Sequence, residues 1–265
     1  MRNILIIIPH YNDLEGLQQT LCSVIEETQV DVVVIDDGSK EKPNKSKIKF
    51  QGNVFLKFLP INSGIGIALN KGLEFAVKNK YEYIGRLDCG DLCHKNKFTK
   101  QLGYLSKNKD IKLLGSWVRG IDEKGNFKYN LKHPTSYSII KKKMYLNSMF
   151  VHPTVIFRAE ILSKIGNYPF KYRRAAQDYA FFFNILKHYK AENYPEILLD
   201  YVMSNRSISN TKRKLQVYHR IRIIIDNFYL GIIPIYAVIR NLILLIIPIN
   251  ILTFIKSKLY RWKLL

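Results

Sequence analysis

The feature that most constrains the fold is an alternation of short apolar runs with helix-patterned segments in the first third of the chain. The apolar runs cover residues 4–8, 30–35, 54–59 and 83–87. The first run contains only isoleucine and leucine and ends at Pro9, which is typical of a strand buried on both faces of a parallel sheet. Segments 14–25 and 67–77 carry apolar residues at helical spacing. The sequence therefore predicts an α/β fold with a Rossmann-like, doubly wound sheet flanked by helices.

The second half of the chain is less regular. It follows a helix expected at 98–105. Short strands are expected at 113–118, 127–129 and 152–158, with a hairpin turn at 123–126 and a helix at 177–188. We interpret 1–205 as one domain with two halves, 1–105 and 106–205.

Polar clusters follow three of the predicted strands directly. They are Pro9-His10-Tyr11-Asn12, Asp36-Asp37-Gly38-Ser39 and Asp88-Cys89-Gly90-Asp91. Ligands of doubly wound sheets bind where the carboxyl ends of the strands meet the loops. We therefore expect the three clusters to line one cleft.

The acidic turn offers two carboxylates at the end of a buried strand. Hard oxygen ligands suit Mg²⁺ or Mn²⁺, and such a cation neutralises the charge that grows on a diphosphate leaving group. We expect Asp88 and Asp91 to ligate the metal, with Gly90 forming the tight turn. The alternative is a pair of turn-forming aspartates without a ligand.

The other two clusters suit a nucleotide. The carboxylate of Asp36 or Asp37 can accept hydrogen bonds from a base N–H or a ribose hydroxyl. Tyr11 and Asn12 offer an aromatic face and an amide to the base. The alternative for the two aspartates is an ordinary strand-ending turn.

In order and spacing, these motifs resemble family 2 glycosyltransferases over residues 4–201. The resemblance rests on Ile8-Pro9-His10-Tyr11-Asn12, Val34-Ile35-Asp36-Asp37-Gly38-Ser39, Asn62-Ser63-Gly64 with Ala68-Leu69-Asn70-Lys71-Gly72, Arg86-Leu87-Asp88-Cys89-Gly90-Asp91, His152-Pro153-Thr154-Val155-Ile156-Phe157-Arg158 and Gln177-Asp178-Tyr179. It implies a GT-A fold with a mixed sheet, in which 1–105 is the nucleotide-binding half and 106–205 the acceptor-binding half of one catalytic domain. It also implies an inverting transfer of a sugar from a nucleotide diphosphate sugar, in the first place a UDP-sugar.

The resemblance further implies roles for single residues. Asp178 is implied as the general base that takes the proton of the acceptor hydroxyl; the alternative is that it caps the helix after it. Contacts to the nucleotide sugar are expected at Pro9, Tyr11, Asn12, Asp36, Asp37, Asn62, Gly64, Arg86 and Asp88. Contacts to the acceptor or the diphosphate are expected at His152, Arg173, Arg174 and Gln177, unless the arginines are solvated and the histidine belongs to a strand. Family members usually carry a carboxylate where this chain has Gly90, so either Asp91 replaces it or Asp88 and the diphosphate hold the metal alone.

The net charge points to an anionic partner. The chain has 42 Lys and Arg against 21 Asp and Glu, a formal charge of +21. Between 205 and 265 the single acid is Asp226, and the basic residues flank an apolar stretch at 227–255 instead of lining an aromatic sheet face. We therefore expect an anionic membrane surface, and no nucleic acid, as the partner.

The apolar stretch carries one charge, Arg240, and is interrupted by Pro234, Asn241, Pro248 and Asn250. We interpret 206–265 as a membrane-associating tail of interfacial or re-entrant helices. The alternative is a hydrophobic hairpin that packs on the catalytic domain or forms a homodimer.

These expectations place the protein at the cytoplasmic face of the inner (plasma) membrane, peripheral or monotopic. Three cysteines without a disulfide spacing favour a reducing compartment, and the first residues show no secretion signal. The expected activity is hexosyl or N-acetylhexosaminyl transfer to a hydroxyl of a glycan or lipid-linked acceptor in surface polysaccharide biosynthesis. The alternatives are a nucleotidyltransferase, although no Gly-rich basic loop follows the first strand, and a basic nucleic-acid-binding protein.

Overall fold

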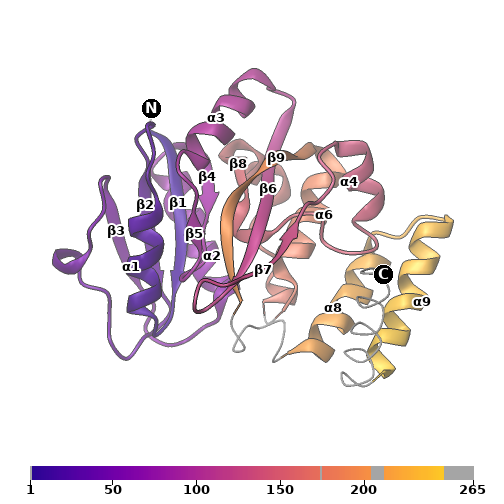
Figure 1. Ribbon diagram of the computed structural model, residues 1–265. Helices are drawn as coiled ribbons and strands as arrows, with labels where there is room; N and C mark the ends of the chain where they lie inside the picture. Colours follow the sequence, from indigo (N-terminus) through magenta and orange to yellow (C-terminus); the bar gives the residue numbers. More distant parts are fainter. Residues whose placement is uncertain (1, 174, 204–211, 248–265) are drawn as a thin grey trace.

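The structure is a computed structural model that describes residues 2–173, 175–203 and 212–247 (Figure 1). Its centre is a nine-stranded sheet in the order β3-β2-β1-β4-β8-β6-β9-β5, with β7 paired to β6. The strands are β1 (Arg2–His10), β2 (Asp31–Asp36), β3 (Val54–Phe58), β4 (Tyr81–Arg86), β5 (Leu92–Cys93), β6 (Ile111–Asp122), β7 (Phe127–Leu131), β8 (Ile156–Arg158) and β9 (Lys190–Met203). β1 to β4 pair in parallel, and β8 is antiparallel to both of its neighbours. The predicted mixed α/β sheet is confirmed.

Helices cover both faces of the sheet. The α-helices are α1 (Leu14–Ser23), α2 (Ile65–Lys78), α3 (Lys97–Lys107), α4 (Tyr137–Lys143), α5 (Leu162–Ile165), α6 (Gln177–His188), α8 (Arg213–Asp226) and α9 (Ile232–Ile246). Short 3₁₀ turns are η1 (Lys45–Lys47), η2 (His152–Thr154), η3 (Ala159–Ile161) and η4 (Phe170–Tyr172). One core lies between the sheet and α2, α4 and α6, and the other between the sheet and α1 and α3.

β1 contributes to both cores because successive side chains of a strand point to opposite faces. Leu5 and Ile7 belong to the core under α2, whereas Ile6 and Ile8 belong to the core under α1. A Cβ on Gly72 of α2 would lie 2.4 Å from Cγ2 of Ile7, so the missing side chain allows α2 to pack closely on the strand. This tight central layer holds the ends of β1, β2 and β4 in register.

The strand expected at 152–158 is shorter than predicted. Only Ile156–Arg158 pairs in the sheet, as β8, whereas His152–Thr154 forms the 3₁₀ turn η2. Pro153 explains the difference, because proline cannot donate a ladder hydrogen bond in the interior of a sheet. His152 is therefore held in a turn, and the expectation of a strand histidine at this position is wrong.

The sequence did not predict β9, the longest strand. Pro195 and charged residues interrupt its apolar pattern, and Pro195 and Glu196 fall between the paired positions Tyr194 and Ile197. The register shift accommodates them, and β9 pairs in parallel with β6 along nearly the whole length of β6. Two residues of β9 then pair with β5, directly after the acidic turn.

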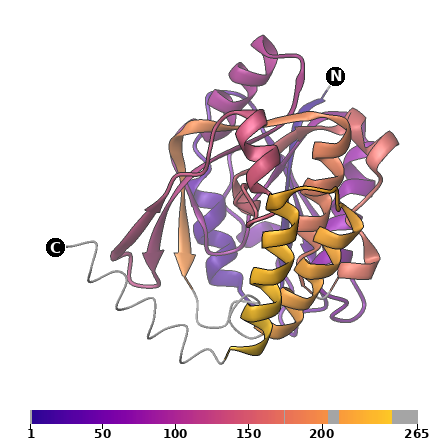
Figure 2. The ribbon, with the colours of Figure 1, turned by 90° about the vertical axis from the view of Figure 1, so that its right-hand side faces the viewer.

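The part of the tail at 212–247 forms the two helices α8 and α9, which lie side by side in Figure 2. Nδ1 of His219 on α8 donates a hydrogen bond of 2.8 Å to the carbonyl of Ala175, just before α6. The guanidinium of Arg240 on α9 donates one of 2.9 Å to the carbonyl of Leu146. Ile223 and Ile224 are buried in the core under α6. Residues 206–211 and 248–265 of the predicted tail lie outside the described residues.

One face of α9 is apolar and exposed. Its large exposed side chains recur at helical spacing: Ile232, Ile235, Tyr236, Ile239, Leu242, Ile243 and Ile246. We call this set the α9 stripe. Within the described parts of the chain, no helix is both long and apolar enough to cross a bilayer.

Candidate functional site

The ends of β1, β2 and β4 lie side by side, as predicted. His10 pairs with Asp36 at the ends of β1 and β2, and Ile7 pairs with Arg86 at the end of β4. All three strands run in the same direction, so the polar clusters that follow them share one edge of the sheet.

Asp36 is fully buried and holds the first two clusters together. Nε2 of His10 accepts from the N–H of Asp13 at 3.3 Å, so Nδ1 carries the proton that it donates to Asp36 at 2.7 Å. The other carboxylate oxygen of Asp36 accepts from the N–H of Ser39 at 3.2 Å. Both oxygens are therefore engaged inside the protein, and the expected contact of Asp36 with the donor stays a prediction.

Asp37 connects β2 to the start of α2. Its two carboxylate oxygens accept from the backbone N–H groups of Ser63, at 2.7 Å, and Gly64, at 2.8 Å. Burial raises the pKa of Asp37, and these two hydrogen bonds only partly offset that effect. Gly64 has a φ of +94°, a conformation that favours glycine, and Asn62 before it is exposed. Asp37 thus fixes the predicted Asn62-Ser63-Gly64 motif beside the end of β2.

Tyr11 is the exposed aromatic residue of the first cluster, with half of its surface (50%) accessible. Asn12 positions the loop: its N–H donates to Oγ of Ser39 at 2.8 Å, and its side-chain oxygen accepts from the N–H of Lys40 at 2.9 Å. Pro9 is partly buried at the end of β1. This loop therefore presents a ring whose face is free to stack on a base.

Arg86 and Asp88 form an ion pair at the end of β4. The Arg86 side chain is almost completely buried, and it also donates to the carbonyl of Leu87. Asp88 remains partly exposed (33%). The turn after it is fixed by Thr20 of α1, whose hydroxyl accepts from the N–H of Gly90 at 2.9 Å and donates to the carbonyl of Asp91 at 2.9 Å. Gly90 has a φ of +92°, so the turn favours glycine at this position.

Asp91 points into the protein. One of its oxygens accepts from the N–H of Val202 on β9 at 2.9 Å, and the other is buried without a hydrogen-bond partner among the described residues. Burial and the negative charge of Asp88 raise the pKa of Asp91 well above its usual value. Within the described parts of the chain, no group of three or more His, Cys, Asp and Glu side chains is arranged to hold a metal. The predicted metal ligands are thus one open and one buried carboxylate.

Asp178 lies in the first turn of α6, and Ala176 takes the N-cap position with a φ of +61°. The Asp178 carboxylate accepts from its own N–H and from that of Tyr179. Burial raises its pKa; those hydrogen bonds and the positive charge of Arg220 oppose the rise, whereas the negative charge of Asp88 adds to it. The structure therefore brings the predicted base close enough to the acidic turn for the two charges to interact.

Three residues that the sequence did not indicate lie near the carboxylates of Asp88, Asp91 and Asp178. Burial raises the pKa of Tyr201 on β9, and the charges of Asp88, Asp91 and Asp178 add to the effect. Burial is also the main cause of the raised pKa of Tyr168, and the charges of Asp178 and Asp88 add to it. Arg220 on α8 is the third: burial lowers its pKa, and Tyr179 and Asp178 oppose that change. None of the three belongs to a local motif.

The residues predicted to contact the acceptor or the diphosphate are His152, Arg173, Arg174 and Gln177. Nε2 of His152 lies 2.8 Å from the hydroxyl of Tyr168, and burial followed by the charge of Arg86 lowers the pKa of His152 well below its usual value. Both effects favour the neutral imidazole. Arg173 packs beside the start of α2: a Cβ added to Gly66 would lie 3.3 Å from the Cα of Arg173. Gln177 is buried at the first position of α6, and Arg174 lies outside the described residues.

Known proteins match both the sequence and the fold. The model of the family described as Glycosyl transferase family 2 matches residues 5–166. An uncharacterized glycosyltransferase of Methanocaldococcus jannaschii is 30% identical over 96% of this chain and 93% of its own length. The amylovoran biosynthesis glycosyltransferase AmsE of Erwinia amylovora is 28% identical over 97% of this chain and 98% of its own length. An Escherichia coli enzyme named UDP-Gal:alpha-D-GlcNAc-diphosphoundecaprenol beta-1,3-galactosyltransferase is 27% identical over 82% of this chain and 83% of its own length.

Two solved structures share the fold. S. aureus TarS 1-349 in complex with UDP-GlcNAc superposes with a TM-score of 0.63 at 17% identity, over 84% of this chain and 67% of that one. The chain spans only 42% of a longer TarS structure. The mannosyltransferase PcManGT of Pyrobaculum calidifontis, in complex with GDP-Man and Mn2+, gives a TM-score of 0.63 at 15% identity, over 91% of this chain and 69% of that one.

Proposed function

Because the chain belongs to glycosyl transferase family 2, we propose that it transfers a sugar from a nucleotide diphosphate sugar, a UDP-sugar, to a hydroxyl of a glycan or lipid-linked acceptor with inversion. The observation that carries the proposal is that the charges of Asp178 and Asp88 lie close enough to interact. Asp178 is a partly buried carboxylate with a raised pKa, and Asp88 is a partly exposed carboxylate after β4. A base and a leaving-group site within electrostatic reach are what a single displacement requires.

In the proposed reaction, Asp178 accepts the proton of the acceptor hydroxyl while the oxygen of that hydroxyl attacks the anomeric carbon. The bond from this carbon to the diphosphate breaks on the opposite face, and the nucleoside diphosphate leaves with the electron pair. The raised pKa of Asp178 supports this role, because a base with a pKa nearer the working pH binds the proton more strongly. Inversion follows because one displacement changes the anomeric configuration once.

The donor is assigned to the edge formed by β1, β2 and α2. The exposed Tyr11 ring offers a stacking face for a base, and Asn62 and Arg173 border the entrance of α2. Asp37 keeps this loop in place through Ser63 and Gly64. The UDP donor is supported by the TarS complex with UDP-GlcNAc and by the UDP-Gal named for the E. coli relative. A screen of donors distinguishes a hexose from an N-acetylhexosamine as the transferred sugar.

A divalent cation, Mn²⁺ or Mg²⁺, fits the acidic turn. Asp88 supplies an open carboxylate, and a cation beside it would offset the cost of burying the unpartnered oxygen of Asp91 next to a second negative charge. When bound, the metal would neutralise charge on the departing diphosphate. The Mn2+ in the PcManGT complex supports this assignment.

The relatives and the tail support a proposal for the acceptor and the location. The E. coli relative is named for a diphosphoundecaprenol-linked substrate, and the Erwinia relative for amylovoran biosynthesis. We therefore place this enzyme in surface polysaccharide synthesis at the cytoplasmic face of the membrane. The α9 stripe, on a chain with a net charge of +21, supports contact with an anionic surface. A homodimer through the same stripe is the competing arrangement.

A donor screen tests the proposal. Purified protein with Mn²⁺ or Mg²⁺ is incubated with a panel of nucleotide diphosphate sugars, and the released nucleoside diphosphate is measured. We expect one UDP-sugar to be turned over, a chelator to stop turnover, and Asp178→Asn to slow transfer by at least about 100-fold. Asp110→Asn, whose partner Lys190 is on the surface, is the matched control. No release from any donor, or an Asp178→Asn variant of normal rate, would contradict the assignment.

A further inference from the structure

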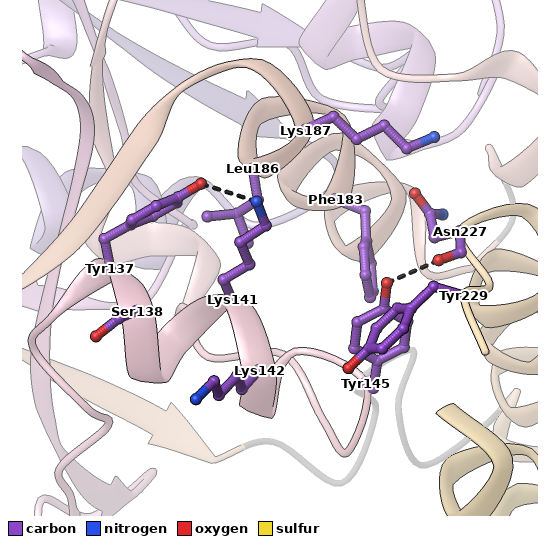
Figure 3. Close-up of a pocket in the computed structure, with 10 residues that line it drawn as sticks. All are labelled: Tyr137, Ser138, Lys141, Lys142, Tyr145, Phe183, Leu186, Lys187, Asn227 and Tyr229. Carbon is purple, nitrogen blue, oxygen red and sulfur yellow. Dashed lines mark hydrogen bonds between the residues drawn. The ribbon is translucent and has the colours of Figure 1, made fainter. Parts of the chain in front are cut away.

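A cavity of about 570 Å³ lies between α4, α6 and the turn that joins α8 to α9, and none of the polar clusters after β1, β2 and β4 lines it (Figure 3). It takes residues from the middle and end of α6, whereas Asp178 stands at the start of that helix. The volume is that of a typical small-ligand pocket. Neither the proposed reaction nor the donor site uses it.

The floor of the cavity is apolar and fixed. Phe183 and Leu186 of α6 are buried there. The Tyr145 ring makes edge contacts with Phe183, at a centroid distance of 5.2 Å, and with Tyr229, at 5.4 Å. Its hydroxyl donates to the carbonyl of Asn227 at 2.7 Å and so ties the turn between α8 and α9 to the wall. Figure 3 shows these three rings gathered on one side of the cavity.

The rim of the cavity is basic. Three exposed lysines line it, Lys141 and Lys142 from α4 and Lys187 from α6, and no Asp or Glu is among the described residues around it. Nζ of Lys141 donates to the Tyr137 hydroxyl at 3.1 Å, which holds that ammonium group across the opening from the aromatic side. No ion pair within the described chain neutralises these three lysines. An apolar floor beneath an unneutralised basic rim suits a ligand with one apolar and one anionic part.

The cavity also continues into the apolar surface of the tail. Tyr229 lines it and is half-exposed, and the next residue, Leu230, is 92% exposed. The α9 stripe begins two residues later, at Ile232. Exposed apolar surface of this extent marks a protein or membrane contact. The basic rim complements the charge of an anionic leaflet, which favours the membrane over a second, equally basic copy of this chain.

We propose that this cavity binds one anionic phospholipid of the membrane, with its anionic headgroup at the basic rim and the first carbons of its chains on the aromatic floor. The lipid would hold α4 and α6 of the catalytic domain at the membrane surface, beside α9. This inference deepens the proposed membrane location but does not depend on the transfer chemistry. A free phosphate would make no contact with the apolar floor, so the lysines alone should not hold it.

Vesicle binding tests the proposal with the full chain. Sedimentation is measured with phosphatidylcholine vesicles alone and with vesicles that also contain phosphatidylglycerol. The test variant is Lys141→Glu/Lys142→Glu/Lys187→Glu. The control is Lys45→Glu/Lys47→Glu/Lys49→Glu, which makes the same charge change at exposed lysines in the connection between β2 and β3. We expect the test variant to bind phosphatidylglycerol vesicles roughly 100-fold more weakly than wild type, and the control to lose no more than about threefold.

Soluble ligands separate a lipid from a free phosphate. Short-chain phosphatidylglycerol below its micelle concentration should change the tyrosine fluorescence of the wild type and not of the test variant, whereas inorganic phosphate should bind neither. Equal vesicle binding by the test and control variants, or equal affinity for inorganic phosphate and the short-chain lipid, would overturn the proposal. Donor turnover, measured in the same preparations, tests the proposed enzymatic function separately, because none of the six lysines belongs to the donor site.

Discussion

The carboxylate of Asp91 accepts a hydrogen bond of 2.9 Å from the backbone N–H of Val202, and this bond ties the acidic turn after β4 to the end of β9. Asp88, three residues earlier, is partly exposed and pairs with Arg86. The two carboxylates therefore differ in their surroundings: Asp88 is partly exposed, whereas Asp91 faces the protein interior. They should respond differently to substitution.

Replacing Asp88 by Asn is expected to lower kcat/KM by about 100-fold or more and to weaken the dependence on Mn²⁺, because the open carboxylate is lost from the site of the leaving diphosphate. Asp91→Asn keeps an acceptor for Val202 and should change the metal dependence less. A Mn²⁺ titration of both variants decides the point. Equal effects would show that the two carboxylates act as one metal site.

Replacing Asp91 by Ala is a separate test of its structural role. The partly buried N–H of Val202 then loses its acceptor, which should lower the free energy of unfolding by roughly 1–3 kcal/mol. Denaturant unfolding of Asp91→Ala and Asp91→Asn measures the difference. If Asp91→Ala were as stable as wild type, the bond to Val202 would not hold the turn.

The pH dependence of transfer should report Asp178. Burial raises the pKa of this carboxyl, and a general base is active only when deprotonated. The rate should therefore rise with pH through a pKa above the ordinary range of an aspartate and then level off. A pH profile of kcat/KM at saturating metal measures this limb, and Asp178→Asn should lose it. Full activity down to the pKa of an ordinary aspartate would contradict the assignment.

Replacing Arg220 should shift the pH profile of kcat/KM that reports Asp178. Its positive charge lowers the pKa of Asp178, so Arg220→Ala should move the acid limb to higher pH, whereas Arg220→Lys should restore most of the wild-type profile. Arg222→Ala is the matched control, because Arg222 stands on the same helix and is exposed. A purely structural role would lower stability and leave the pH of the limb where it is.

Asp37 should matter for both stability and donor affinity. Asp37→Ala removes the acceptor of two backbone N–H groups, from Ser63 and Gly64, and should lower the free energy of unfolding by about 2–4 kcal/mol. Asp37→Asn retains one acceptor and should fall between Asp37→Ala and wild type. Thermal unfolding and donor titration calorimetry measure the two effects. Normal donor affinity in a folded Asp37→Ala protein would exclude this loop from the donor site.

The sequence predicted the part of the fold in which one local pattern determines each element. The runs at 4–8, 30–35, 54–59 and 83–87 became β1 to β4, and their polar ends meet at one edge because parallel strands align their carboxyl ends. The family assignment follows the same motifs. What these motifs could not show is which polar groups are already satisfied inside the protein. Asp36, engaged by His10 and Ser39, is the clearest example.

The other side of the site depends on contacts between distant segments. Tyr201 reaches the acidic turn only because β9 pairs with β6 and β5, and Pro195 concealed that strand. Arg220 reaches Asp178 only because α8 packs beside α6. A single sequence contains no local signal for either contact. The basic cavity shares this origin, since α4, α6 and the turn after α8 form it together.

The parallel pairing of β6 with β9 also has a consequence for synthesis of the protein. β6 leaves the ribosome before α4, α5 and α6, and only then does β9 follow. Until that moment one edge of β6 lacks its partner, and pairing between strands so distant in sequence is slow and prone to aggregation. The nascent chain therefore cannot close its sheet, or place Tyr201 beside the acidic turn, until most of it has been translated. Segments expressed only as far as residue 166, where the family match ends, should need chaperones or fail to fold.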